Sequence, residues 1–257
     1  MTIKKIFIIV CVLALSVLLF ACADDVVKKE NKKLAESSYK MGLSYFSENN
    51  ITAALKELVK ANQYDPEDVE INHLLGIAYL SKKDYANAEK HLKKALANSK
   101  ENTPKIDNNL GIVYLEQERY DDAIVQFKKA ADDILYDTPE IAYINIGQAY
   151  YKKGDIDNAK KSYEKSIEIE PRDSRAYYNL GALYFDLKKY DDAVKEYKIA
   201  LKFYPNYLDA QYSLALTYFK QSDAEKAKEA FNKVIELAPK DSKQAEESKG
   251  YLDTLNK

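Results

Sequence analysis

The stretch from Ser174 to Tyr207, SRAYYNLGALYFDLKKYDDAVKEYKIALKFYPNY, decides the fold. It is typical of two short amphipathic helices joined by a tight turn, with Pro205 closing the second helix. The positions that define the pattern are apolar or small, and they are Leu180, Gly181, Tyr184, Ala193, Tyr197 and Ala200. A single such unit carries little information, so the question is whether the chain repeats it.

The pattern recurs six times in register. The small residue after Leu180, used here as the marker of each copy, returns at intervals of 34, 35, 36, 34 and 34 residues, as Gly42, Gly76, Gly111, Gly147, Gly181 and Ala215. Every copy has tyrosine three residues after the marker, alanine twelve residues after it, and a large apolar residue four residues after that alanine. All six prolines lie at copy boundaries, where proline ends one helix or begins the next.

The repeated spacing resembles the tetratricopeptide repeat, a helix-turn-helix unit of about 34 residues. The resemblance implies an all-α fold, a right-handed α-solenoid of six units over residues 35–68, 69–103, 104–139, 140–173, 174–207 and 208–241. Residues 242–257 are expected to form a capping helix, because an open end would expose the apolar face of the last unit. Glycine inside a helix costs about 1 kcal/mol relative to alanine. The five marker glycines therefore need a packing reason, and the resemblance implies one, because the two helices of such a unit approach closely at this position.

The N-terminal residues 1–21 are typical of a signal peptide, with Lys4 and Lys5 before an apolar run of 14 residues, Ile6 to Leu19. The sequence LFAC at residues 19–22 resembles a bacterial lipobox, which implies lipidation of Cys22. An ordinary signal peptide or an uncleaved anchor is the alternative. Residues 22–34 are expected to be the lipidated cysteine and a charged tether. Because Ala23 rather than aspartate follows Cys22, we expect an outer-membrane location facing the periplasm.

Nothing in the sequence indicates catalysis, a cofactor or a metal site. His73 and His91 lie eighteen residues apart with no ligand at metal-binding spacing nearby, and we expect them on the surface or in a groove. The acidic pairs Asp121-Asp122 and Asp191-Asp192 directly precede the alanine that lies twelve residues after the marker. We interpret them as helix caps. A formal net charge of −2 gives no basic face for nucleic acid. The function is therefore expected to be binding of proteins or peptides.

The resemblance implies a concave groove lined by the first helix of each copy. The three central copies place asparagine at one position of that wall, and asparagine amides can pair with a peptide backbone. Lysine or arginine lies beside this ladder, and tyrosines at another position could anchor a partner. The candidate partner-binding residues are Asn109, Asn145, Asn179, Lys105, Arg175, Tyr178 and Tyr212. The alternatives remain that the asparagines bond to neighbouring helices and that the aromatic residues only pack.

The third copy is two residues longer than the 34-residue copies, and its extra length lies in DDILYDTPE at residues 132–140. Its Tyr136 to Pro139 junction is similar to that of the type IV pilus pilotin family, outer-membrane lipoproteins of six such repeats. The resemblance implies a secretin subunit as partner and assistance to secretin assembly as function. The alternative is a general periplasmic adaptor for cell-wall enzymes, outer-membrane assembly or secretion machinery.

Overall fold

The computed structural model describes residues 26–256, and all regular structure in that range is α-helix. The expected all-α fold is therefore confirmed. Residues 1–21 and Cys22, with the predicted signal peptide and lipidation site, lie outside the described residues. Within residues 26–256, no helix is both long enough and apolar enough to span a bilayer.

The described helices follow one another in hairpins, two in each expected copy. A first helix covers residues 26–47. It is followed by α2 (Ile51–Tyr64), α3 (Val69–Ser81), α4 (Tyr85–Asn98), α5 (Pro104–Glu116), α6 (Tyr120–Ala131), α7 (Pro139–Lys153), α8 (Ile156–Ile169), α9 (Ser174–Asp186), α10 (Tyr190–Phe203), α11 (Leu208–Lys220), α12 (Ala224–Leu237) and α13 (Lys243–Leu255).

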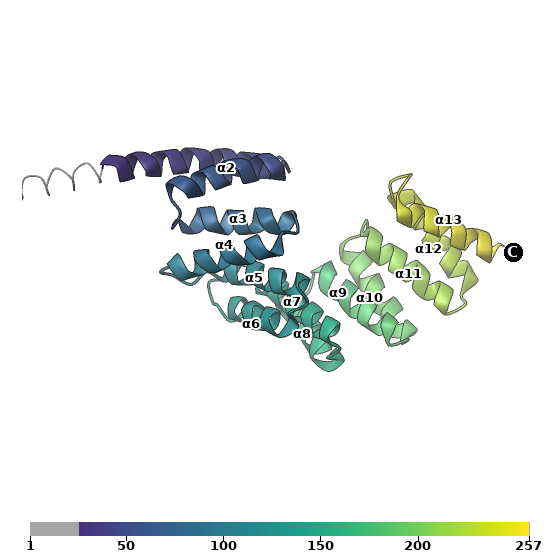
Figure 1. Ribbon diagram of the computed structural model, residues 1–257. Coiled ribbons are helices and arrows are strands. Elements are labelled where there is room, and N and C mark those ends of the chain that lie inside the picture. The colour runs from purple at the N-terminus through teal and green to yellow at the C-terminus, as the bar shows by residue number, and fades with distance from the viewer. Residues whose placement is uncertain (1–25, 257) are drawn as a thin grey trace, which may run out of the picture. The chain divides into compact units, whose positions relative to one another are not determined.

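The chain divides into two compact units, residues 1–113 and 114–257, with the boundary inside α5. In the first unit, α3 packs on α2 and α4, around a core that includes Leu58, Ile71 and Leu75. In the second unit, each helix from α6 to α13 packs on the next one along the chain. Figure 1 shows the antiparallel course of successive helices inside each unit. Each unit thus builds its core from contacts between neighbours in sequence.

The marker glycines allow the two helices of a copy to touch. A Cβ atom built on Gly147 would lie 2.4 Å from Cε1 of Tyr163, which is far inside van der Waals contact. The equivalent distances are 2.7 Å from Gly42 to Leu58, 2.5 Å from Gly76 to Leu92 and 2.8 Å from Gly181 to Tyr197. The alanine twelve residues after the marker is completely buried in all six copies: Ala54, Ala88, Ala123, Ala159, Ala193 and Ala227. The predicted close approach of the helices is confirmed at these four copies.

The turn inside every hairpin contains a left-handed residue seven positions after the marker. These residues are Asn49, Lys83, Glu118, Gly154, Lys188 and Ser222, and φ is 87° at Gly154 and between 57° and 61° at the other five. The next N–H donates to the carbonyl of the repeated tyrosine, for example Asp84 N to Tyr79 O at 2.9 Å and Lys189 N to Tyr184 O at 2.9 Å. This bond closes the helix end as in a Schellman motif. Among these six residues only Gly154 is a glycine, the residue type that adopts this conformation without strain.

The acidic pairs are not the capping residues of their helices. The N-cap positions of α6 and α10 are Arg119 and Lys189, and neither makes a side-chain capping bond. In each pair the aspartates lie two and three residues after the N-cap, inside the first turn of the helix: Asp121, Asp122, Asp191 and Asp192. They interact there with the positive end of the helix, as expected, but without accepting the capping bond. True caps occur in other copies, where Asn50, Asp84, Asp155 and Asp223 each accept from the backbone three residues on.

Residues 26–33, expected as part of a charged tether, are helical and continue into the first helix of copy one. Most of their side chains are exposed, including Val26 and Val27. The segment KKENKK contains neither glycine nor proline, and lysine and glutamate are good helix formers. Helix propagation from an existing turn requires only such residues. These residues are therefore not irregular, and their role as a charged tether stays a prediction.

The last helix, α13, packs against α12 as the pattern predicted. Ala245 is buried, and Tyr251, Leu252 and Leu255 contact the core of the final copy. The ring of Tyr251 stacks on Phe231 with centroids 4.8 Å apart and an interplanar angle of 6°. Stacking of two large rings removes apolar surface that copy six would otherwise expose.

Candidate partner-binding surface

In the first unit, the predicted groove residue Asn109 is held against the preceding copy. Asn109 Nδ2 on α5 lies 2.9 Å from Nε2 of His73 on α3. Burial, followed by the charge of Lys105, lowers the pKa of His73, so its imidazole stays neutral and can accept this bond. Lys105 itself is exposed near the start of α5. The amide of Asn109 thus serves a helix-to-helix contact in this structure.

In the second unit, Asn179 lies between α7 and α9. Its Oδ1 accepts from Gln148 Nε2 at 3.3 Å, and its Nδ2 donates to the carbonyl of Arg175 at 2.7 Å. Gln148 and Asn179 border a hollow of about 270 Å³, whose lining residues are Gln148, Tyr151, Lys152, Tyr163, Asn179, Ala182 and Leu183. Asn145 is half-buried on α7. The hollow presents amide groups, an amine and aromatic edges to solvent, which suits an extended peptide.

The remaining predicted residues have partners inside the fold. The guanidinium of Arg175 forms a two-point bond with Asp173, at 2.9 Å from Nε to Oδ1 and 2.6 Å from NH2 to Oδ2, and this bond raises the pKa of Arg175. The ring of Tyr178 packs on Tyr207 with centroids 5.0 Å apart. The hydroxyl of Tyr212 donates to Glu247 of the capping helix at 2.7 Å. These contacts position the side chains and leave part of each exposed.

Four of the copies have an aromatic residue four positions after the marker, and these residues pack inside the fold. Phe46, Tyr151, Phe185 and Phe219 each contact a core cluster of their unit. The Tyr151 hydroxyl also donates to Asp186, whose pKa is raised by burial. We therefore assign these residues to the contacts between helices.

His91 departs from its expected surface or groove position, because it is buried between α3 and α4. Its Nδ1 lies 2.9 Å from Oδ1 of Asn72, which is fully buried, and its ring stacks on Tyr79 at 5.5 Å. Asn72 Nδ2 donates to the carbonyls of Pro66 and Asp68. Burial is the main cause that lowers the pKa of His91. Among residues 26–256, no group of three or more His, Cys, Asp or Glu could hold a metal ion.

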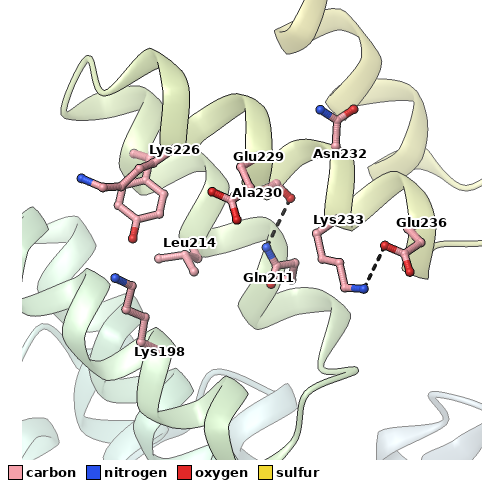
Figure 2. Close-up of a pocket in the computed structure, with 10 residues that line it drawn as sticks. Lys198, Gln211, Leu214, Lys226, Glu229, Ala230, Asn232, Lys233 and Glu236 are labelled. Atoms are coloured by element: carbon pink, nitrogen blue, oxygen red, sulfur yellow. Dashed lines mark hydrogen bonds and ion pairs between the residues drawn. The ribbon is translucent and has the colours of Figure 1, made fainter.

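A larger hollow, of about 700 Å³, lies between α10, α11 and α12 and was missed by the sequence analysis (Figure 2). The Tyr218 ring has the amines of Lys198 and Lys226 at 5.8 and 5.6 Å from its centroid. Lys226 pairs with Asp223 at 2.6 Å and Lys233 with Glu236 at 2.8 Å. The lysines occupy different positions of the repeat, so no period marks them. The mixed charges around an apolar floor suit contact with a protein surface.

Comparison with known proteins agrees with this geometry. The description "TPR repeat" matches residues 42–83 and 147–188, and "Tetratricopeptide repeat" matches residues 67–133 and 172–240, which together exceed half of the chain. No curated protein matches the chain.

Several solved structures share the fold. PilF of Pseudomonas aeruginosa is 21% identical, with 86% of this chain and 99% of that chain covered and a TM-score of 0.68. PilW, described as a widely conserved type IV pilus biogenesis factor, is 20% identical, with 87% and 98% covered and a TM-score of 0.73. MamA is 28% identical over 63% of this chain and 94% of its own, with a TM-score of 0.55. The helical hairpins, the glycine seam and these matches lead to one conclusion: the chain belongs to the tetratricopeptide repeat family, whose members are protein-interaction scaffolds.

Proposed function

We propose that this protein is a lipid-anchored scaffold of the bacterial outer membrane that assists assembly of the type IV pilus secretin. The observation that carries the proposal is the end-to-end correspondence with PilF and PilW, which covers 98–99% of their chains. At about 20% identity this correspondence concerns the fold, so the pilus role is inferred from it together with the junction residues of the third copy.

The junction supports the proposal through its structure. Tyr136 is 7% exposed and packs against Ala130 and Ala142, so it fixes the loop between α6 and α7. Pro139 begins α7, where proline fits without losing a hydrogen bond. Both residues that the pilotin resemblance singled out therefore help to hold the junction in shape.

The main test is deletion of the gene in its own host, followed by a gel for heat-resistant secretin multimers. We expect the multimers to be lost and to return when the full chain is supplied again. Multimers that persist in the deletion strain would remove the pilus function. Defects in cell-wall synthesis or in outer-membrane barrels in that strain would favour the general adaptor instead.

The lipid anchor is tested separately with the Cys22→Ser variant. We expect this variant to lose incorporation of labelled fatty acid and to leave the membrane fraction, while its helicity is unchanged. A Cys11→Ser variant is the control, because Cys11 lies within the predicted signal peptide. Continued labelling of the Cys22→Ser protein would contradict lipidation at this residue.

The groove is tested by changing Asn109, Asn145 and Asn179 together to alanine. We expect weaker capture of the secretin subunit by the full chain. Loss of the bonds to His73 and Gln148 also costs about 1 kcal/mol of stability for each bond, so capture must be measured well below the melting temperature. The control is Asn206→Ala, an exposed loop position. Unchanged capture by the triple variant would place the partner on another face.

A further inference from the structure

The loop between α6 and α7 exposes two aliphatic side chains to water. Ile134 is 96% exposed and Leu135 is 78% exposed, the highest values among the exposed large hydrophobic residues of the described chain. They lie in the segment that makes the third copy longer than the 34-residue copies. Paired exposed aliphatic residues on a monomer indicate a contact surface more often than isolated ones.

The loop holds this pair in a defined position. The backbone N–H of Leu135 donates to Oδ1 of Asp133 at 2.8 Å, and the N–H of Tyr136 donates to the carbonyl of Asp133 at 3.0 Å. The buried ring of Tyr136 anchors the next position against Ala130 and Ala142. Because the turn is already formed, docking of the two side chains requires little further ordering of the chain.

The charges around the pair select the kind of partner. Asp132, Asp133 and Asp137 flank Ile134 and Leu135 within six residues, and the segment contains no basic residue. Three carboxylates oppose insertion into an anionic membrane surface, because such a surface attracts basic segments. They complement a protein pocket with a basic rim.

We propose that residues 132–137 form a docking knob, in which Ile134 and Leu135 enter an apolar pocket with a basic rim on a partner protein. The identity of that partner rests on the function proposed above, so the partner is the secretin subunit. The docking knob adds to that function the contact through which this protein binds the secretin subunit.

The first experiment measures binding of purified full chain to purified secretin subunit. We expect the Ile134→Ser/Leu135→Ser variant to raise the Kd by at least about tenfold, because burial of even one aliphatic side chain lowers the Kd of a complex by more than about tenfold. We expect Asp132→Lys to weaken binding mainly at low salt, where charges are least screened. The matched control is Ile169→Ser, at the end of α8 in the next copy, where the side chain is 38% exposed. Melting curves of the Ile134→Ser/Leu135→Ser and Asp132→Lys variants should match that of the parent, because these side chains are exposed. Binding by Ile169→Ser is measured well below its own melting temperature, because that side chain is partly buried.

The second experiment places a photo-crosslinking amino acid at position 135, or at position 169 as control, in the full chain inside the host. A crosslink to the secretin from position 135 and none from 169 is the expected result. If secretin multimers require the protein but the double variant binds as the parent does, the knob is overturned and the function stands. If the multimers persist without the protein, both are overturned. Loss of self-association in sedimentation, or of vesicle binding, with secretin binding intact would overturn the knob in favour of a second copy or a membrane.

Discussion

Replacing the left-handed turn residues with glycine should stabilise the protein. At Lys188 the backbone has φ of 57°, and the side chain is exposed, so the lysine contributes little packing that glycine would lose. A residue with a Cβ atom pays about 1–2 kcal/mol in this conformation, whereas glycine adds about 0.5–1 kcal/mol of unfolded-state entropy. The difference predicts a gain of about 0.5–1 kcal/mol for Lys188→Gly.

The same reasoning applies to Lys83, Glu118 and Ser222, which have φ between 59° and 61° and exposed side chains. Asn49 should gain least, because asparagine tolerates the left-handed region better than other residues. The four sites lie one copy or more apart in sequence and share no hydrogen-bond partner, so their effects should add within about 0.5 kcal/mol. The quadruple variant should therefore gain about 2–4 kcal/mol in total, summed over the unfolding transitions of the chain.

The control is the reverse substitution, from glycine to alanine, at Gly154. An added Cβ there would meet nothing within 4 Å, so Gly154→Ala tests the φ of 87° without any clash. We expect it to destabilise by about 1 kcal/mol. The assay is urea unfolding followed by circular dichroism, with each transition fitted separately, because repeat proteins need not unfold in one step. A lower midpoint for Lys188→Gly, or an unchanged midpoint for Gly154→Ala, would refute the argument from backbone strain.

Three further predictions concern the interior. Ser166→Ala should raise the free energy of unfolding by about 1 kcal/mol, because the fully buried Ser166 Oγ has no hydrogen-bond partner; an unchanged or lower value would contradict this. Gly147→Ala should lower it by about 1–3 kcal/mol through overlap with the Tyr163 ring, and Tyr163→Leu should not rescue it fully. The lowered pKa of His91 means that the unfolded chain binds this proton more tightly than the folded chain. The stability from its neutral ring is complete above pH 6.5 and is lost as the pH falls below that value, so midpoints at pH 5.5 should lie below those at pH 7.5, and less so in His91→Gln.

The parts of the fold that were predictable lie within one copy. The close approach at Gly147 and the burial of Ala159 follow from a spacing that the sequence repeats six times. The left-handed turns were predictable only at Gly154, because lysine, glutamate and serine give no sign of a positive φ. In the same way, the caps were misplaced at Asp121 because a carboxylate in the first turn lies only two residues after the N-cap, Arg119.

The candidate site was less predictable for a reason that the structure makes explicit. Many side-chain bonds between one copy and the next, or between the last copy and the capping helix, join residues 30–36 positions apart. Examples are Asn109 with His73, Gln148 with Asn179 and Tyr212 with Glu247. A polar side chain repeated once per copy is thus suited both to a bound peptide and to the helix of the next copy. Which of the two it serves depends on the distance between helices, which the period does not contain. This ambiguity does not affect Ile134 and Leu135. They lie in the extra segment of the third copy, outside the repeated pattern, and their side chains are exposed to solvent rather than packed on a helix.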